Sequence, residues 1–417
     1  MTKRRVVITG LGTINPLGPN VETSYPRMLA GENGVRRLTR IDAPDLSSQI
    51  AATLDWDLTE HGFRPPDARK MDPFTLWAMV AADEALRDAG LEDVAQEDEE
   101  CRWRYGSIIG TGIGGITGVL EQQGVLLERG ARRVSPHFIP RIMSNAVSGQ
   151  VAIRHGLMGT AFTTTSACAS AGHAIGMAWR AIQWDECDMV VTGGSESAIT
   201  HLSLAGFASA KALSTRNDSP ETASRPFDAD RDGFVMGEGC GILVLEEYER
   251  AKARGARIYA EVKGYGSTDD AHHITAPRVD GTGPARAFQQ ALDHAGLNPE
   301  DVQYINAHGT STAYNDSIET RAIKLTFGDH AQRLAVNSTK SMVGHLLGAA
   351  TGLELLVTVM AVHTGQIHPT RNYTTPDPEC DLDYVPGDAR DWPIQNALCN
   401  SLGFGGHNVS IAVGKLD

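Results

Sequence analysis

The run Thr165-Ser166-Ala167-Cys168-Ala169-Ser170-Ala171-Gly172 lies where an apolar stretch, residues 161–167, passes into a helical pattern that extends to about Trp184. These small residues predict a strand-to-helix junction with a cysteine at the turn. A helix amino terminus stabilises a thiolate and exposes its sulfur. Cys168 is therefore a candidate nucleophile, although a cysteine among alanines can also be a buried small hydrophobic residue.

Two histidines further along the chain lie in similar small-residue settings. His308 follows an apolar stretch and precedes Gly309-Thr310-Ser311-Thr312, and His345 ends the run Lys340-Ser341-Met342-Val343-Gly344-His345. One thiol and two imidazoles indicate nucleophilic acyl chemistry with a second step that needs two proton donors. His308 could instead be a loop histidine whose ring is satisfied by neighbouring hydroxyl groups.

Lys340 and Glu354 form a second prediction. Glu354 lies within the apolar run Leu353-Glu354-Leu355-Leu356-Val357, where an unpaired carboxylate would be costly. Lys340, on the segment that leads into this helix, is the nearest cationic partner. Such a pair would fix the tautomer and charge of His345, or it would be a structural ion pair only.

Two glycine-rich segments have different interpretations. Residues 110–115 (Gly-Thr-Gly-Ile-Gly-Gly) formally match the dinucleotide-binding pattern, but no acidic residue for a ribose follows about 20 residues later. We expect a flexible wall beside a substrate channel instead. Phe404, a single large ring in Gly403-Phe404-Gly405-Gly406, is typical of a movable gate, the alternative being a packing anchor.

Strands alternate with helices along the chain, which predicts an α/β fold with a largely parallel or mixed sheet. We expect strands at 6–9, 105–110, 161–167, 189–192, 258–265, 304–307, 334–338 and 409–413. Helices are expected at 74–89, 146–155, 168–184, 285–295, 318–327 and from residue 344 onward.

Two halves, residues 1–252 and 253–417, echo each other. Gly172-His173-x-x-Gly176 matches Gly344-His345-x-x-Gly348, and the strand at 6–10 matches the strand at 259–264. The echo favours a duplicated unit. The site would then form where the halves meet, with Cys168 from the first half and both histidines from the second.

Composition narrows the class of protein. With 417 residues, 41% of them hydrophobic and 44 of them glycine, the chain is typical of a compact globular enzyme. Its net charge of −14, from 37 basic and 51 acidic residues, argues against nucleic-acid or anionic-membrane binding. The six cysteines lack C-x-x-C spacing, and no histidine or cysteine grouping, His272-His273 included, has zinc-ligand spacing. We expect reduced thiols, no bound metal and a cytoplasmic protein.

The start of the chain does not predict a secretory signal, because its apolar stretch is short and interrupted by glycine, proline and asparagine. No run of about 18 apolar residues is evident, so we expect no membrane-spanning segment.

The chain resembles the β-ketoacyl-[acyl carrier protein] synthases, especially the type II enzymes of bacterial fatty-acid synthesis. The resemblance spans almost the whole chain, from Arg5-Val6-Val7-Ile8-Thr9-Gly10-Leu11-Gly12 to the predicted loop at 400–408. Its separate blocks occur in the same order as in the family: 165–172, 212–217, 225–228, 232–239, 306–312, 340–349 and 400–406.

The resemblance implies a thiolase-like fold, with two similar halves in five αβαβα layers, and usually a homodimer. It also implies a ping-pong decarboxylative condensation. Cys168 would carry the acyl group as a thioester, and His308 and His345 would stabilise the enolate formed when malonyl-carrier protein loses CO₂. The N–H groups of Cys168 and Phe404 would form the oxyanion hole.

Other residue roles are also implied by the resemblance. Thr310 and Thr312 would hold the phosphopantetheine arm, and Ile113 would line the acyl pocket and affect chain length. Supporting positions and docking positions for acyl carrier protein are also matched. The supporting residues are Asp316, Glu319 and Glu354, and the docking residues are Arg69, Lys70 and Lys211. No cofactor is implied.

The chain departs from the family at Leu402, where phenylalanine is usual, and at His407, where threonine is usual. Both flank the gate, so they bear on acyl preference and not on the reaction. Three alternatives stay open: a condensing subunit of a polyketide or other secondary pathway, a non-catalytic chain-length partner, and a dehydrogenase. The intact cysteine argues against the second.

Overall fold

The computed structural model describes residues 3–42, 44–56 and 63–416, and its central feature is a ten-stranded mixed sheet. The strands of the first half are β1 (Val6–Ile14), β4 (Tyr105–Gly110), β5 (Ala161–Phe162), β6 (Met189–Glu196) and β7 (Gly239–Glu247). Those of the second half are β8 (Ala260–Asp269), β9 (Tyr304–Asn306), β10 (Ala335–Asn337), β13 (Asn396–Gly403) and β14 (His407–Gly414).

The two halves have the same strand order and join through their first strands. From the outer edge inward, the first half runs β5-β4-β6-β7-β1 and the second runs β10-β9-β13-β14-β8. β1 pairs antiparallel with β8, where Val7 lies opposite Glu261. The division at residue 252 stays a prediction; it falls at the end of α10 (Tyr248–Ala253).

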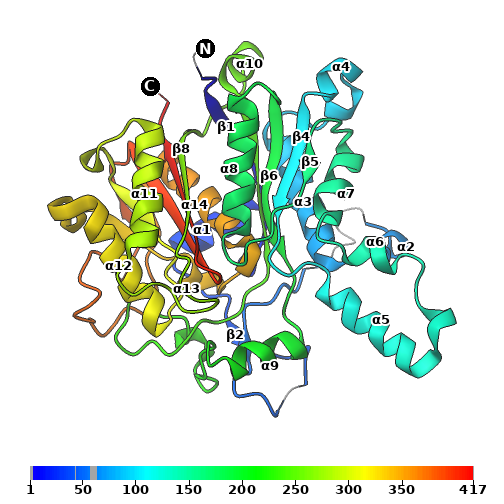
Figure 1. The fold of residues 1–417 in the computed structure, drawn as a ribbon, viewed down its shortest axis with the longest axis horizontal. Coiled ribbons are helices and arrows are strands. Elements are labelled where there is room, and N and C mark those ends of the chain that lie inside the picture. The colour runs from blue at the N-terminus through cyan, green and yellow to red at the C-terminus, as the bar shows by residue number, and fades with distance from the viewer. Residues whose placement is uncertain (1–2, 43, 57–62, 417) are drawn as a thin grey trace.

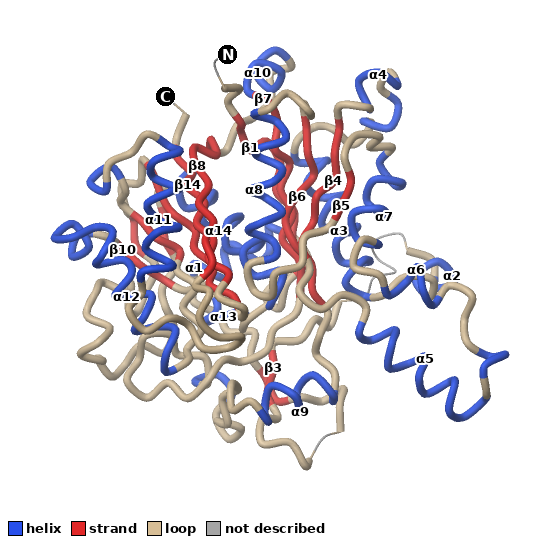
Figure 2. Tube along the Cα trace, viewed as in Figure 1, coloured by secondary structure: helices blue, strands red, loops and turns tan. Residues whose placement is uncertain are grey.

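Helices form the remaining layers. α8 (Ser170–Gln183) and α14 (Ala350–Thr364) pack on each other between the two halves of the sheet, and each contacts strands of both. α3 (Pro73–Asp88) and α7 (Ala146–His155) cover the outside of the first half, whereas α11 (Thr282–Ala295) and α12 (Ala313–Phe327) cover the second. Figures 1 and 2 show the strands in two groups on either side of α8. The arrangement is the expected αβαβα order.

The remaining elements lie around these layers. The helices are α1 (Val21–Leu29), α2 (Pro65–Ala68), α4 (Glu99–Arg102), α5 (Ile116–Arg129), α6 (Phe138–Ile142), α9 (His201–Ser209) and α13 (Lys340–Val343). The short strands are β2 (Arg36–Arg37), β3 (Ile50–Ala51), β11 (Gln366–Ile367) and β12 (Arg390–Asp391). Single 3₁₀ turns occur at Val94–Gln96, Ala131–Arg133, Pro220–Thr222, Pro299–Asp301, Gly328–Arg333 and Leu347–Ala349.

Glycine pairs allow the outer helices to approach the two central strands. A Cβ on Gly10 or Gly12 of β1 would lie 2.1 or 2.0 Å from a carbonyl oxygen of α3. On Gly264 or Gly266 of β8, it would lie 2.1 or 1.9 Å from a carbonyl oxygen of α11. A pair of glycines therefore allows close packing of the outer helix on the central strand in both halves.

The sequence echo at the two Gly-His-x-x-Gly runs does not correspond to equivalent positions, contrary to our expectation. Gly172 is the third residue of α8, whereas Gly344 precedes α14 by six residues. In the repeated topology the counterpart of His345 is Cys168, because each follows the third strand of its half and precedes the central helix.

Four of the differences from the predictions bear on the sheet and its edge. The predicted loop at 400–408 is mostly strand, since β13 and β14 form a hairpin. β7 was not predicted because glycines interrupt it; Gly241 is required where a Cβ would lie 2.3 Å from Leu353 N. α5 was not predicted either, and among its residues only Gly118 is buried, so the helix has no core-facing apolar stripe. The predicted strand at 161–167 is ordered as strand only at Ala161–Phe162.

One segment, Leu347–Thr364, is long and apolar enough to cross a membrane by length and composition. It consists mainly of α14, and 83% of it is buried inside the protein. Its position between the two halves of the sheet accounts for its apolar character.

Candidate active site

Cys168 lies in the turn between β5 and α8, two residues before the helix begins. Ala167 has a φ of 49°, a left-handed conformation that is costly for alanine. This turn sets Cys168 at the amino terminus of α8, as the sequence predicted, and leaves its side chain half-buried. The Ser401 hydroxyl donates a hydrogen bond of 3.0 Å to the Cys168 carbonyl oxygen, which ties the turn to β13.

His345 lies directly beside the thiol. Its Nε2 is 3.1 Å from Cys168 Sγ, and its Nδ1 accepts a hydrogen bond of 3.2 Å from the backbone N–H of Leu347. An acceptor at Nδ1 means that a neutral ring carries its proton on Nε2. His345 therefore presents an N–H group to the site.

His308 presents its Nε2 in the same way. The Lys340 ammonium donates to His308 Nδ1 at 3.2 Å and to the His308 carbonyl oxygen at 2.7 Å. Because an ammonium group has no acceptor, Nδ1 must be the unprotonated nitrogen. The rings of His308 and His345 are nearly perpendicular, with centroids 5.3 Å apart.

The predicted Lys340–Glu354 pair exists, but it acts on a different histidine from the one expected. Lys340 Nζ donates to Glu354 Oε1 at 2.5 Å, and both side chains are buried. The third contact of this ammonium is His308, not His345. The prediction that the pair fixes the His345 tautomer is therefore wrong, since the Leu347 backbone N–H performs that role, whereas the Lys340 charge does act on the His345 pKa.

The environment keeps both imidazoles neutral. Burial lowers the pKa of His308 well below 6.5, and the positive charge of Lys340 lowers it further. The same two causes, burial first, lower the pKa of His345. At neutral pH both rings are therefore hydrogen-bond donors without a net charge.

Burial raises the pKa of the Cys168 thiol to about 11. The Lys340 charge and a hydrogen bond from the Phe404 backbone N–H work against this shift, whereas Glu196 adds to it. The thiolate therefore needs stabilising groups at the moment of reaction, which the α8 amino terminus and the His345 N–H can supply.

Two buried carboxylates hold the His308 loop. Glu319 accepts the backbone N–H groups of His308 and Gly309, both at 2.8 Å. Asp316 accepts those of Phe227 and Ser311, at 2.8 and 3.1 Å. Burial raises the pKa of both carboxyl groups, that of Glu319 to about 7. Glu319 binds the loop backbone, and Asp316 joins the loop to Phe227 and lies 3.8 Å from the Arg231 guanidinium, which fits supporting positions.

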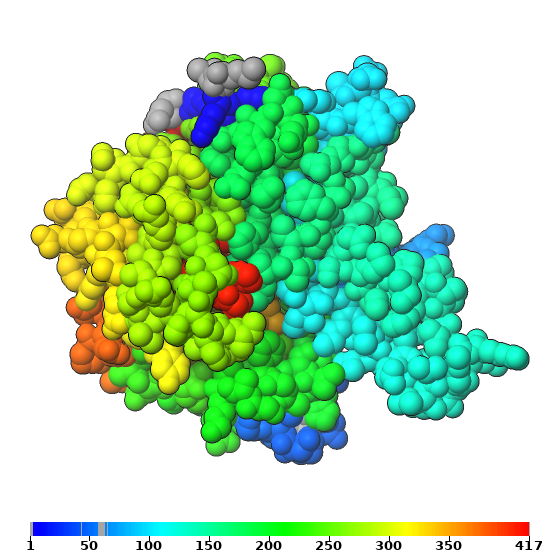
Figure 3. Space-filling view, in the orientation of Figure 1, coloured from blue at the N-terminus to red at the C-terminus, as the bar shows by residue number. Residues whose placement is uncertain are grey.

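The predicted gate and pantetheine positions surround these groups. Phe404 lies in the turn between β13 and β14 and is 39% exposed; the red patch at the centre of Figure 3 marks this part of the chain at the surface. The Thr310 and Thr312 hydroxyl oxygens lie 2.9 Å apart at the start of α12. Leu402 is 9% exposed on β13, and His407 pairs with Asp269 at 3.1 Å.

The glycine-rich loop at 110–115 is not free to bind a phosphate. The backbone N–H groups of Gly112, Ile113 and Gly114 all point at the buried carboxylate of Glu196. An internal carboxylate thus occupies the donors that a dinucleotide would require. The loop is anchored, so the expectation of a flexible wall is wrong, and the dehydrogenase alternative loses its only motif.

Sequence reasoning missed three residues at the site. Glu196 was not singled out, although it is a carboxylate at the end of an apolar strand, which is a signal that could have found it. Phe234 contacts His345 edge-on, with ring centroids 5.3 Å apart. Leu347, which fixes the tautomer, acts through its backbone and leaves no signal in its side-chain identity.

The three predicted docking residues are exposed and lie in two places. Arg69 and Lys70 follow α2, where Lys70 pairs with Asp67 at 3.1 Å. Lys211 follows α9. Figure 1 shows α2 and α9 at separate edges of the molecule.

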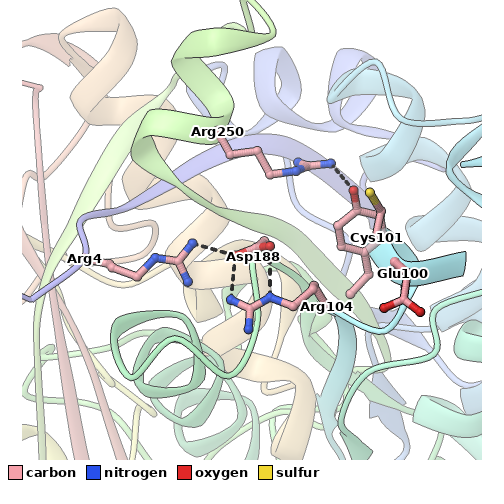
Figure 4. A pocket seen from close by; sticks show the side chains of 7 residues that line it. Arg4, Glu100, Cys101, Arg104, Asp188 and Arg250 are labelled. Atoms are coloured by element: carbon pink, nitrogen blue, oxygen red, sulfur yellow. Dashed lines mark hydrogen bonds and ion pairs between the residues drawn. The ribbon is translucent and has the colours of Figure 1, made fainter. Parts of the chain in front are cut away.

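A pocket of about 500 Å³ lies at the opposite ends of β4 and β6 from this site (Figure 4). Its cationic side chains are engaged by other groups: Arg4 and Arg104 pair with Asp188 at 2.6 and 2.8 Å, and Arg250 donates to the Tyr105 hydroxyl at 2.8 Å. The pocket is an ion-paired surface cluster away from the nucleophile.

Family models match both halves of the chain. Residues 3–251 match the β-ketoacyl synthase N-terminal domain, and residues 259–374 match the β-ketoacyl synthase C-terminal domain. The chain belongs to the β-ketoacyl synthase family. It is 50% identical over 416 residues to a 3-oxoacyl-[acyl-carrier-protein] synthase 2 of Synechocystis, covering 100% of this chain and 99% of that protein. A protein of the same name from Staphylococcus aureus is 48% identical over 415 residues, with 99% of both chains covered.

Solved structures of β-ketoacyl synthases share the fold. A β-ketoacyl synthase from Burkholderia phymatum is 36% identical with a TM-score of 0.90, covering 99% of this chain and 100% of its own. A ketosynthase solved in complex with its type II polyketide acyl-carrier protein is 34% identical with a TM-score of 0.92, and both chains are covered completely. The expected thiolase-like fold is thereby confirmed.

Proposed function

We propose that this chain is a 3-oxoacyl-[acyl carrier protein] synthase that elongates fatty acids by decarboxylative condensation. One observation carries the proposal: two neutral histidines present Nε2–H groups beside a cysteine at a helix amino terminus. A nucleophile with two uncharged donors suits a reaction that forms a thioester and then an enolate. The identity of 48–50% over whole chains to proteins of this name supports it.

In the first half-reaction, Cys168 sulfur attacks the carbonyl carbon of an acyl thioester on the carrier protein. The new S–C bond forms, the bond to the phosphopantetheine sulfur breaks, and the cysteine proton leaves with the carrier thiol. The developing oxyanion would accept hydrogen bonds from the backbone N–H groups of Cys168 and Phe404. The Phe404 N–H lies close enough to the thiol to lower its pKa, which places it near the reacting atoms.

In the second half-reaction, a malonyl thioester occupies the site and loses CO₂. The electron pair of the broken C–C bond forms an enolate, whose oxygen accepts the Nε2–H groups of His308 and His345. The enolate carbon then attacks the Cys168 thioester, and the thiolate leaves. Thr310 and Thr312 would hold the arm. The reaction is redox-neutral, so we expect no cofactor. With Nδ1 of each ring accepting an N–H, the Nε2 atoms carry protons and do not suit a metal.

The direct test is mass spectrometry after incubation with acyl-carrier protein. An added acyl mass on the peptide that contains Cys168 is expected. An adduct on another residue, or none, would refute the proposed mechanism.

A flat pH profile near 6.5 is the expected consequence of the two depressed histidine pKa values. Because both rings are neutral well below pH 6.5, malonyl decarboxylation should not change through that pH. The decarboxylation rate should fall only at lower pH. There a proton would bind to Nδ1 of each ring and displace the hydrogen bond from the Lys340 ammonium or the Leu347 N–H. Decarboxylation is measured as CO₂ release across pH, and an inflection near 6.5 would contradict the assigned tautomers.

A condensing subunit of a polyketide pathway would share every catalytic residue proposed here. The solved polyketide ketosynthase is 34% identical, against 50% for the Synechocystis relative. The difference favours fatty-acid elongation, and an acyl-chain panel would separate the two, since a polyketide subunit would extend a β-ketoacyl chain in preference to a saturated one.

We further propose a homodimer that covers the α5 face. Large apolar side chains are exposed there on α5, α6, α7 and the edge strand β5: Val119, Leu126, Leu127, Ile139, Met143, Ile153 and Phe162. β5 has a sheet neighbour on one side only, and α5 projects from the body (Figure 1). A second copy would cover both features.

Replacing Ile153, which is 76% exposed, with glutamate should shift the protein from dimer to monomer in light scattering. The matched control is Leu325→Glu, because Leu325 is 56% exposed on α12 in the other half. A wild-type monomer at micromolar concentration, or equal effects of the two changes, would contradict this interface.

We propose acyl carrier protein as the partner, docked through Arg69, Lys70 and Lys211, whose positive charge suits an acidic carrier. We also propose that the protein is cytoplasmic. All six cysteines lie in the described part of the chain and are unpaired, which supports a reducing compartment.

A further inference from the structure

Glu196 joins the glycine-rich loop to the segment that orients His345. The residue ends β6 and is buried. Its Oε2 accepts the backbone N–H groups of Gly112 at 2.7 Å, Ile113 at 3.2 Å and Gly348 at 3.1 Å. Gly348 directly follows Leu347, whose N–H fixes the His345 tautomer.

The other carboxylate oxygen extends the same junction. Glu196 Oε1 accepts the Thr111 hydroxyl at 3.0 Å and the Gly114 N–H at 3.3 Å. The loop that bears Ile113 is therefore held by one side chain, that of Glu196. Because these partners are nearly all N–H groups, which cannot accept a proton, they favour the ionised carboxylate, while burial raises its pKa.

Backbone packing shows that the junction leaves no free space. A Cβ built on Gly348 would lie 2.0 Å from Gly112 N, so the two segments touch through their backbones. A Cβ on Gly112 would lie 3.3 Å from the carbonyl oxygen of Ala167, the residue before the nucleophile. A shift of the loop at 111–114 would therefore displace the segments that carry Cys168 and His345.

We propose that Glu196 is a positioning residue of the condensation site: one carboxylate holds the acyl-pocket wall at Ile113 in fixed relation to His345 and Cys168. It sets which acyl chains fit and adds a negative charge that acts on the Cys168 thiol. The assignment of Ile113 to the acyl pocket rests on the proposed function; the charge that acts on the thiol does not.

Glu196→Gln separates these two effects from general loss of stability. The glutamine carbonyl can accept the donors of Oε2, but its NH₂ then faces the N–H of Gly114, and only the Thr111 hydroxyl can turn to accept it. The Gly114 contact and one half of the shared Ile113 contact are lost, which loosens the loop, while the carbonyl keeps the Gly112, Ile113 and Gly348 contacts. The matched control is Glu84→Gln, since Glu84 is another largely buried carboxylate that accepts backbone N–H groups, of Thr13 and Val21, both at 2.8 Å.

The first measurement is alkylation of Cys168 by iodoacetamide across pH, read by mass spectrometry. Removing the negative charge favours the thiolate, so Glu196→Gln should be alkylated about threefold faster or more below the thiol pKa. Glu84→Gln should match the wild type. This readout needs no acyl substrate, so it tests the junction even if the proposed function fails.

The second measurement is kcat/KM with acyl-carrier proteins of increasing chain length. In Glu196→Gln the ratio of kcat/KM between accepted and rejected chains should shrink about tenfold. Unchanged alkylation and unchanged selectivity would overturn the proposal, as would equal shifts in Glu84→Gln. If Glu196→Gln does not fold, Thr111→Val is the substitute, because it removes one hydrogen bond of the junction. This variant should also reduce the ratio of kcat/KM between accepted and rejected chains, and an unchanged ratio would overturn the proposal.

Discussion

Replacement of Cys168 with alanine is expected to abolish acyl transfer and to lower condensation by about 10⁴-fold or more, because it removes the sulfur that we propose carries the thioester. The fold should persist, since the change removes one half-buried sulfur and leaves the Ala167 turn and the Ser401 contact in place. Condensation is followed as formation of the 3-oxoacyl product, and the acyl adduct by mass spectrometry.

The same variant separates the two half-reactions. The Nε2–H donors of His308 and His345 are fixed by Lys340 and Leu347, not by the thiol. Decarboxylation of malonyl-carrier protein should therefore continue in Cys168→Ala. The matched control is Cys101→Ala, which removes an exposed thiol and should leave both reactions unchanged. Condensation by the Cys168 variant at a wild-type rate would show that the nucleophile lies elsewhere.

Replacement of Lys340 with methionine is expected to cost both stability and activity. The change leaves the Glu354 carboxylate buried without its cation, which should lower the free energy of unfolding by about 3–5 kcal/mol. It also removes the donor from His308 Nδ1, so the ring can place its proton there and lose the Nε2–H that faces the substrate. Denaturant unfolding and CO₂ release measure the two effects.

A double variant distinguishes charge burial from histidine orientation. Lys340→Met with Glu354→Gln removes both charges and should recover part of the lost stability, whereas decarboxylation should stay low because His308 still lacks its donor. Lys324→Met is the control, since the Lys324–Asp381 pair is partly exposed and should contribute less than about 1 kcal/mol. Recovery of activity in the double variant would show that Lys340 does not orient His308.

The central topology could be predicted only in part, for a physical reason visible in particular strands. The first strands of the two halves, β1 and β8, are apolar runs with glycines, and their echo is present in the sequence. β14 was predicted at 409–413, whereas β13 was taken for part of a loop and β7, which has glycines required by contacts with a distant element, was missed. Gly241, for example, faces the backbone of Leu353.

The sequence by itself indicated the three side chains that we propose react. Cys168, His308 and His345 each follow a strand in a small-residue segment, which is a local property, and the separate blocks around them specify the family. Their convergence follows from the repeated topology, in which Cys168 and His345 occupy equivalent places before the central helices α8 and α14.

Only the tertiary structure decided which groups orient them. Lys340 is five residues from His345, yet its ammonium binds His308 because β9 and β10 are parallel neighbours and the residues that follow them lie side by side. Glu196 meets the loop at 111–114 for the same reason, since β4 and β6 pair with Gly110 opposite Gly194. Such contacts depend on which strands are neighbours in the sheet. The distance between two residues along the chain does not show which strands are neighbours.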